Sequence, residues 1–269
     1  MDRVKTHAGC PYTTKQTSLL SLYNKGKVYQ IPRYKRGQGD LMSNDALKKA
    51  VAERAVNDYV KDGMVVGLGT GSTAYHAINR IGELVNKEGY KLTCVATSVR
   101  SEEQAKSLGI TVVDVNDVES IDVTIDGADE VDPDMQLIKG LGGALIREKI
   151  VAAASQSEVI IVDETKTVDM LGTKCALPVE VLKFGYQKTK YALEAQGCKA
   201  TLRMNGDEPF VTDNGNYIYD CKFESIKNPF FLESRINVIP GTVDNGLFLN
   251  TASTVLISHS DGTIEKRGL

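Results

Sequence analysis

Residues 121–149, with the sequence IDVTIDGADEVDPDMQLIKGLGGALIREK, contain an apolar run that leads into a turn holding two carboxylates. The run Ile121–Ile125 is short and bounded by a turn, which is typical of a buried strand. The turn Asp126–Asp129 has the sequence DGAD. Because the loops after the carboxyl ends of the strands form the ligand site in open α/β sheets, we expect a ligand at this turn.

A lysine and a glutamate follow within one βα unit. Lys139 precedes a glycine-rich turn at residues 140–143, and the apolar run Ala144–Ile146 opens a helix that carries Glu148. Glycine lets a substrate approach the backbone closely. Since burying several charges is costly unless they are paired, these side chains are candidates for a catalytic site.

The composition excludes several classes of function. The chain has 269 residues and a net charge of −3, and residues 1–40 hold eight Lys and Arg against two Asp. The remaining body is therefore acidic, which argues against a nucleic-acid surface. No run approaches the roughly 18 apolar residues of a membrane span. The five cysteines include no CxxC pair and the three histidines no zinc-binding pattern, so we expect free thiols, a cytoplasmic location and no metal.

Residues 1–41 form a basic leader without a clear hydrophobic period. Met42 directly precedes Ser43, and the segment that follows is typical of a capped helix start. We hypothesise that the native domain begins near Met42 and that the leader is non-native. A disordered tail and a transit peptide are the alternatives, the latter because acidic residues are scarce.

A second glycine-rich loop has the features of an anion site. The apolar strand Met64–Val66 leads into residues 67–73, GLGTGST, and a helix follows. Backbone N–H groups and the helix dipole converge there, and three hydroxyls add donors. No lysine precedes the Ser/Thr pair, and Ser72 stands where a dinucleotide fingerprint has its third glycine, so a single phosphate is favoured. A tight βα turn without a ligand is the alternative.

The order of elements predicts an α/β fold with two parts. Strands and helices alternate along residues 64–166, which predicts a Rossmann-like, doubly wound parallel sheet with helices on both faces. After Pro178 the order becomes β-α-β-β-α-β, which predicts a smaller, ferredoxin-like α+β domain. We predict a catalytic domain over residues 42–177, the small domain over 178–245, and a return to the catalytic domain over 246–269.

The segments DGADEVD, IKGLGGAL and REKIVA resemble type A ribose-5-phosphate isomerases, and the resemblance extends from about residue 44 to the C-terminus. It implies an aldose–ketose isomerase of the pentose phosphate pathway that interconverts D-ribose 5-phosphate and D-ribulose 5-phosphate through an enediolate. It also implies a sugar phosphate as the only partner besides further copies of the chain, in a homodimer or homotetramer. No cofactor, nucleic acid or membrane is expected.

Isomerisation needs a base for a carbon-bound proton, acid/base groups at two oxygens, and positive charge where an oxygen becomes negative. Glu148 is the predicted base, because burial can raise the pKa of a glutamate toward neutrality. Asp126 and Asp129 would shuttle a hydroxyl proton and help to open the sugar ring, and Lys139 would stabilise the enediolate. The predicted substrate-binding residues are Lys48, Thr70, Gly71, Ser72, Thr73, Asp126, Gly127, Ala128, Asp129, Lys139, Gly140, Leu141, Gly142 and Lys166.

Each assignment has a simpler alternative. Lys48 and Lys166 could be solvated lysines, and Arg147 and Glu148 a surface ion pair. Thr97 and Ser98 line the site or only cap a helix. Asp126, Asp129, Asp132 and Asp134 could bind a cation, although their spacing is not that of an EF-hand. The rival classes are CoA transferases, which would use the glutamate as a nucleophile, amino-sugar phosphate deaminases, and sugar-phosphate-sensing domains.

Overall fold

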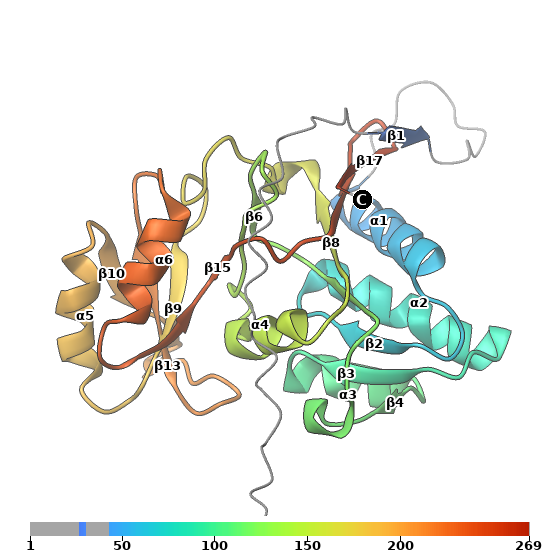
Figure 1. Cartoon of the computed structure of the whole chain (residues 1–269), viewed down its shortest axis with the longest axis horizontal. Helices are drawn as coiled ribbons and strands as arrows, with labels where there is room; N and C mark the ends of the chain where they lie inside the picture. The colour runs from blue at the N-terminus through green and yellow to red at the C-terminus, as the bar shows by residue number, and fades with distance from the viewer. Residues whose placement is uncertain (1–26, 31–42, 269) are drawn as a thin grey trace, which may run out of the picture.

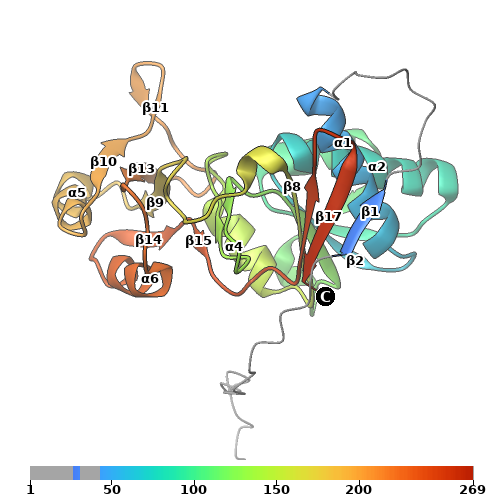
Figure 2. The same cartoon turned by 90° about the horizontal axis from the view of Figure 1, so that it is seen from above.

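The computed structural model describes residues 27–30 and 43–268 (Figure 1). The leader predicted over residues 1–41 therefore lies outside the described residues except for β1 (Lys27–Gln30). This strand pairs antiparallel with β17 (Thr263–Gly268) at one edge of the large sheet. The last described residues thus lie beside a segment from the beginning of the chain, as Figure 2 also shows.

The large sheet confirms the predicted α/β fold. Its strand order is β1-β17-β16-β8-β5-β2-β3-β4, and the strands from β16 to β4 are all parallel. The parallel strands are β2 (Val65–Leu68), β3 (Thr93–Ala96), β4 (Thr111–Val112), β5 (Val123–Asp126), β8 (Glu158–Asp163) and β16 (Thr254–Ser258).

Both faces of this sheet are covered, as the apolar character of its strands requires. In β8, Val159 and Ile161 join one buried cluster with helices α1 and α2, whereas Ile160 and Val162 join another on the opposite face. This division follows from the two-residue period of a strand. The helices are α1 (Asn44–Tyr59), α2 (Ser72–Glu88), α3 (Val99–Ser107) and α4 (Leu145–Ala153), with short 3₁₀ turns η1 (Val115–Asp117) and η2 (Glu164–Lys166).

The small domain has the predicted β-α-β-β-α-β order. Its sheet runs β10-β13-β9-β14, every neighbouring pair is antiparallel, and the hairpin β11–β12 projects from it (Figure 2). The elements are β9 (Leu177–Val181), α5 (Tyr186–Glu194), β10 (Lys199–Leu202), β11 (Met204–Asn205), β12 (Glu208–Pro209), β13 (Tyr217–Lys222), α6 (Pro229–Asn237) and β14 (Thr242–Asn245).

A three-stranded sheet that the sequence did not predict joins the two parts. It consists of β6 (Glu130–Val131), β7 (Leu137–Ile138) and β15 (Leu247–Phe248), and it lies between the large and small sheets (Figure 1). Ile138 and Leu247 belong to the buried cluster of the small domain, whereas Leu137 and Phe248 pack on the large sheet. The two successive residues of β7 therefore pack against different domains, and this strand leads directly to Lys139.

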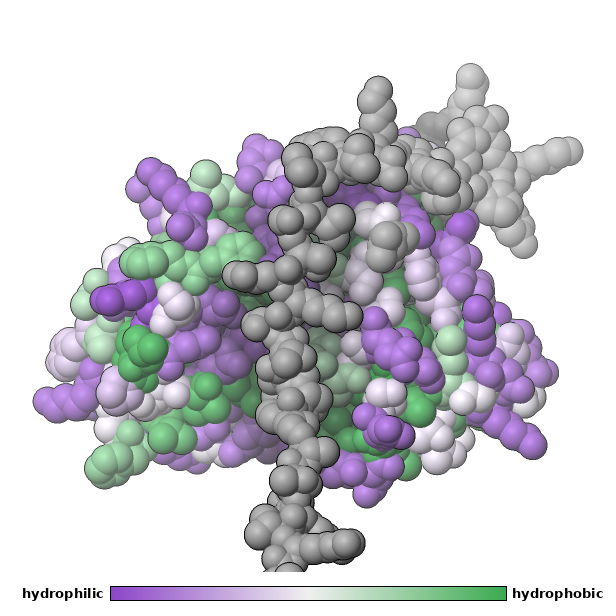
Figure 3. Space-filling model, in the orientation of Figure 1, coloured by the Kyte–Doolittle hydropathy of each residue, from purple (hydrophilic) through white to green (hydrophobic). Residues whose placement is uncertain are grey.

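Exposed apolar side chains are frequent in the small domain. Phe184, Tyr191, Phe230, Phe231 and Val238 are all exposed there. Figure 3 shows apolar patches among hydrophilic side chains on the side of the molecule that carries α5 and α6. None of the helices within residues 43–268 has the length and apolar character needed to cross a bilayer.

Candidate functional site

The loop after β2 presents the open N-terminus of a helix. Gly71 is the N-cap of α2 and has φ +112°, and no side chain caps the first turn. The first N–H groups of an uncapped helix lack partners and carry the positive end of the helix dipole. Ser72 and Thr73 occupy this first turn, so the predicted anion site has both backbone and hydroxyl donors.

Gly69 allows this loop to lie directly against the end of β5. A Cβ atom at this position would lie 2.5 Å from the Asp126 Cα atom and would also overlap the carboxylate. The close approach lets the Thr70 N–H donate to Asp126 Oδ1 at 2.9 Å. The glycine-rich loop after β2 and the acidic turn after β5, both predicted from the sequence, therefore meet at the carboxyl ends of these two strands.

Three charged side chains are buried together at these strand ends. Asp126 is 0% exposed, Lys139 is 2% exposed and Glu148 is 3% exposed. Lys139 Nζ lies 2.9 Å from Asp126 Oδ2 and 3.5 Å from Glu148 Oε2. Glu148 Oε2 accepts no hydrogen bond from the described residues. The end of β5, the segment after β7 and the first turn of α4 each supply one member of this cluster.

Two members of this cluster, Lys139 and Glu148, differ in how they titrate near neutral pH. Burial raises the pKa of Glu148 to about 8, against the opposing Lys139 ammonium and with the help of the Asp126 and Asp129 carboxylates. Burial alone would lower the pKa of Lys139, but Asp126, Glu148 and Glu158 raise it above its ordinary value. Near neutral pH, Lys139 is therefore a fixed cation, whereas Glu148 can accept or release a proton.

A pocket of about 100 Å³ opens above this cluster. Asp129 also faces it, and burial raises the pKa of this carboxyl although the Leu141 N–H donates to its Oδ2 at 2.9 Å. The pocket is lined by Lys48, Thr70, Gly71, Ser72, Thr73, Gly127, Ala128, Asp129, Lys139, Gly140, Gly142, Glu148 and Lys166.

Two of the predicted site residues do not line the pocket. Asp126 lies beneath it, where its carboxylate accepts the Thr70 N–H and pairs with the Lys139 ammonium. A contact between Asp126 and a ligand stays a prediction. The Leu141 side chain is 41% exposed, and this residue contributes only its backbone N–H, to Asp129. The alternative of a surface pair for Glu148 is wrong, because Glu148 is buried and Arg147 donates instead to the carbonyl of Asp213.

Thr97 and Ser98 support the loop from behind. Thr70 Oγ1 lies 2.7 Å from Thr97 Oγ1 and 2.8 Å from Ser98 Oγ, and Ser101, which the sequence did not single out, donates to the Gly69 carbonyl at 2.7 Å. Ser98 also caps α3 by accepting from the Ser101 N–H. These hydroxyls fix the orientation of Thr70 rather than line the pocket.

Glu130 is a second residue that the sequence did not single out. Its buried carboxylate accepts the N–H groups of Gly172 and Lys174, each at 2.6 Å, and that of Cys175 at 2.7 Å. This loop follows η2, which carries Lys166. The only sequence signal was its place directly after Asp129, inside the motif.

The acidic residues after the turn form a backbone turn instead of a charge cluster. Asp132 Oδ1 accepts the N–H groups of Asp134 and Gln136, at 2.9 and 2.8 Å. Within the described part of the chain, no group of three or more His, Cys, Asp or Glu side chains is arranged to hold a metal ion.

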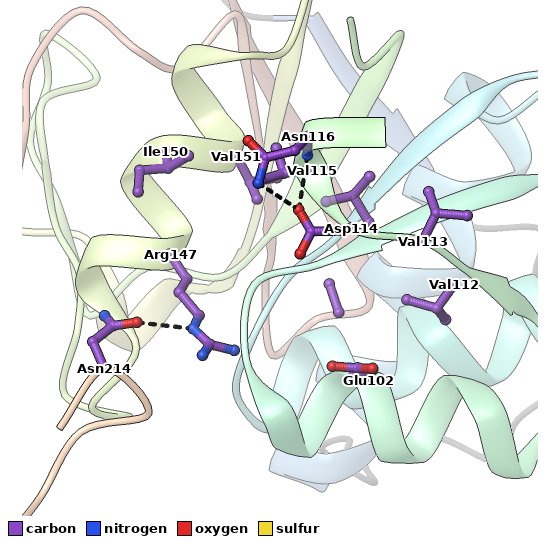
Figure 4. Close-up of a pocket in the computed structure, with 12 residues that line it drawn as sticks. Glu102, Val112, Val113, Asp114, Val115, Asn116, Arg147, Ile150, Val151 and Asn214 are labelled. Atoms are coloured by element: carbon purple, nitrogen blue, oxygen red, sulfur yellow. Dashed lines mark hydrogen bonds between the residues drawn. The ribbon is translucent and has the colours of Figure 1, made fainter. Parts of the chain in front are cut away.

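A larger cavity, of about 370 Å³, lies on the other side of α4 at the ends of β3 and β4 (Figure 4). Arg147 and Ile150 face it from α4, and Arg147 Nε donates to Asn214 Oδ1 at 3.1 Å. Valines form much of its remaining wall, and none of the predicted site residues lines it. We place the candidate site in the smaller pocket because the uncapped N-terminus of α2 and the buried charged cluster both border it.

The fold and the smaller pocket define a class of protein. An α/β sheet presents the uncapped N-terminus of a helix in the same pocket as a buried ammonium and a carboxyl group whose pKa burial raises to about 8. This combination suits an enzyme that moves protons on a small phosphorylated substrate.

Comparison with known proteins gives the family. The profile described as ribose 5-phosphate isomerase A (phosphoriboisomerase A) matches residues 93–262, and the chain belongs to this family. A ribose-5-phosphate isomerase A from Jannaschia sp. (strain CCS1) is 48% identical over 237 residues, which cover 86% of this chain and 90% of the relative.

Solved structures agree with this assignment. The ribose 5-phosphate isomerase from Plasmodium falciparum is 42% identical with a TM-score of 0.81, over 84% of this chain and 99% of its own. A D-ribose-5-phosphate isomerase in complex with phospho-erythronic acid is 37% identical with a TM-score of 0.82, over 85% of this chain and 100% of its own.

Proposed function

We propose that this pocket interconverts D-ribose 5-phosphate and D-ribulose 5-phosphate through an enediolate, with Glu148 as the base. One observation carries the proposal: a buried glutamate with a pKa of about 8 faces the same pocket as an uncapped helix N-terminus. The solved relative that binds phospho-erythronic acid supports a phosphorylated sugar derivative as the ligand. The proposed interconversion belongs to the non-oxidative branch of the pentose phosphate pathway.

The phosphate would bind at the start of α2. Ser72 and Thr73 offer N–H groups and hydroxyls, and Lys48 and Lys166 line the same pocket. Holding the phosphate at this end gives binding energy that orients the distant carbon chain. Carbons 1 and 2 would then lie toward Glu148 and Lys139.

Glu148 would take the proton from carbon 2 of the aldose and return it to carbon 1. As that proton leaves, electron density moves onto the carbonyl oxygen, where the Lys139 ammonium stabilises the negative charge. Asp129 would carry a proton between the two oxygens and assist ring opening. We assign Asp126 a supporting role, because its carboxylate fixes Lys139 from beneath the pocket.

Replacing Glu148 by glutamine tests the base. We expect Glu148→Gln to lower turnover by roughly 100-fold or more with little change in KM, because the amide cannot accept the proton. Conversion of ribose 5-phosphate would be followed in EDTA, with Arg147→Gln as the control, since Arg147 neighbours Glu148 on α4 but faces away from the pocket. Turnover that survives in Glu148→Gln would show that the base is misassigned.

A cytoplasmic location and assembly as a homodimer or homotetramer remain part of this proposal. The exposed apolar side chains of the small domain support the assembly.

A further inference from the structure

Arg203, at the end of β10 in the small domain, contacts the loop that lines the pocket. Its Nη1 donates to the carbonyl oxygens of Gly140 at 3.2 Å and Leu141 at 3.0 Å. Its Nε and Nη2 donate to the two carboxylate oxygens of Asp220, on β13, at 3.0 and 2.5 Å. A guanidinium held in this two-pronged way has a fixed plane, so its third nitrogen has a fixed direction.

The direction of these carbonyls determines where the adjoining N–H groups point. In a trans peptide, the C=O of one residue and the N–H of the next point to opposite sides. Arg203 binds the Gly140 carbonyl, and the Leu141 N–H indeed points the other way, to Asp129 Oδ2 at 2.9 Å. Arg203 also binds the Leu141 carbonyl, so the Gly142 N–H must point away from Arg203.

The Gly142 N–H is free to bind a ligand. Gly142 lines the pocket together with Glu148, and its N–H has no hydrogen-bond partner among the described residues. Phe210, in the same part of the small domain, also packs against this loop at Gly143. Gly143 has φ +86°, and a Cβ atom there would lie 2.5 Å from the ring of Phe210, over which Arg203 is stacked at 5.8 Å.

We propose that Arg203 is a positioning residue that aims the Gly142 N–H at the substrate oxygen on which negative charge develops. This rests on the proposed isomerase function. Arg203 does not line the pocket; it acts through two peptide units whose carbonyls it holds. The small domain thereby takes part in the reaction of the large one. A donor aimed at a developing oxyanion acts mainly on the transition state, so its loss lowers kcat more than it raises KM.

The test compares Arg203→Ala with Arg147→Ala. Both arginines connect the two domains, but Arg147 bridges from α4 to Asp213 and Asn214 and leaves the pocket loop alone. We expect Arg203→Ala to lower kcat by about tenfold or more with less than about a threefold change in KM, since one oxyanion donor is commonly worth 100-fold or more. Arg147→Ala should keep the wild-type kcat. Guanidinium ion, at millimolar concentration, should restore part of the lost kcat in Arg203→Ala only.

Three results would overturn the proposal while the wild type remains active. They are an unchanged kcat in folded Arg203→Ala, an equal loss in Arg147→Ala, and a loss confined to KM. If Arg203→Ala does not fold, Arg203→Lys decides, because an ammonium keeps the charge but its three N–H donors, all on one atom, cannot reproduce the four hydrogen bonds of the planar guanidinium. An unchanged kcat there also overturns the proposal. Failure of the proposed function is recognised separately, by a wild type that does not convert ribose 5-phosphate.

Discussion

Glu148 owes its expected reactivity to the imbalance of charge in its surroundings. Two buried carboxylates, on Asp126 and Glu148, share one ammonium, on Lys139. Asp126 Oδ1 also accepts the N–H groups of Thr70 and Gly127, and Asp126 Oδ2 lies 2.9 Å from the Lys139 ammonium, whereas Glu148 Oε2 lies 3.5 Å from it. Burial raises the pKa of Glu148, so this glutamate can take up or release a proton near neutral pH.

The pH dependence of the reaction follows from this. A base must be ionised to act, and burial raises the pKa of Glu148 to about 8, so kcat/KM should rise with pH up to about 8 and level off above it. A pH–rate profile measures the midpoint. Lys166→Ala is the control, because a weaker phosphate contact should lower kcat/KM at every pH without moving the midpoint. A plateau already complete at pH 6 would contradict the assignment.

At the scale of elements, the junction between β2 and β5 depends on the missing side chain of Gly69. In Gly69→Ala the new Cβ would lie 2.5 Å from the Asp126 Cα, and backbone atoms cannot move aside easily. We expect a loss of about 1–3 kcal/mol in the free energy of unfolding, as for other overpacked sites, together with a lower kcat/KM.

Gly82→Ala is the matched control for that variant. Its Cβ would lie 3.2 Å from the nearest neighbouring atom, the Leu108 Cβ, so a small shift of that side chain is enough, and alanine is favoured within α2 by about 0.5–1 kcal/mol. Denaturant unfolding of both variants gives the comparison. Equal stabilities would show that the close contact of the β2 loop with Asp126 is not limiting.

Glu130 connects the acidic motif to the loop that follows η2, the 3₁₀ turn that carries Lys166. In Glu130→Gln, one carboxylate oxygen becomes an NH₂ group that faces backbone N–H groups, and at least one hydrogen bond is lost. We expect a loss of about 1–3 kcal/mol in the free energy of unfolding. Because η2 precedes this loop, we also expect KM to rise several-fold with a smaller change in kcat.

The control for Glu130 is another fully buried glutamate with several donors. Glu180 accepts from Thr212 and Asn216, each at 2.9 Å, in the small domain and away from the pocket. Steady-state kinetics and thermal unfolding should show that Glu180→Ala, which leaves the Thr212 and Asn216 donors without their acceptor, is destabilised with an unchanged KM. A KM that rises equally in both variants would mean that general loosening, and not the position of Lys166, is responsible.

Periodicity and turn chemistry made most elements predictable. The helices α1 to α6 and the central strands follow from local patterns, because each buries one apolar face or run. The three-stranded sheet escaped prediction because its strands are two residues long and Ile138 pairs with Leu247, far along the chain. Pairing over such a separation leaves no local signal.

The site was predictable to the extent that its residues occur in recognisable motifs. The apposition of Lys139 and Glu148 follows from the family resemblance, and the anion loop from its glycines and hydroxyls. Local spacing could not show that Asp126 lies beneath the pocket, since that depends on where β2 and Lys139 approach it. Arg203 was invisible for the same reason, because its contacts join residues about sixty positions apart.

At the scale of the molecule, the pocket lies where the chain passes between its two domains. Lys139 follows the three-stranded sheet, and its N–H donates to the Gly246 carbonyl, where the chain returns from the small domain. Arg203 and Phe210 contact Gly140, Leu141 and Gly143, in the segment that follows. A shift of the small domain would therefore move the loop between Lys139 and Glu148, so we regard the small domain as part of the catalytic unit.

Assembly into dimers or tetramers is the prediction that belongs to the whole molecule. Phe230 and Phe231 on α6 are 47% and 62% exposed, and neighbouring exposed apolar groups can mark a contact surface. Each phenylalanine buried in an interface stabilises it by about 1.5–3 kcal/mol, so the double variant Phe230→Asp, Phe231→Asp should weaken association by roughly 100-fold or more. Light scattering after gel filtration should show a dimer or tetramer for the wild type and a smaller species for the variant. Tyr75→Asp, which charges an equally exposed site on α2, should keep the wild-type mass; a double variant of unchanged mass would exclude α6 from the interface.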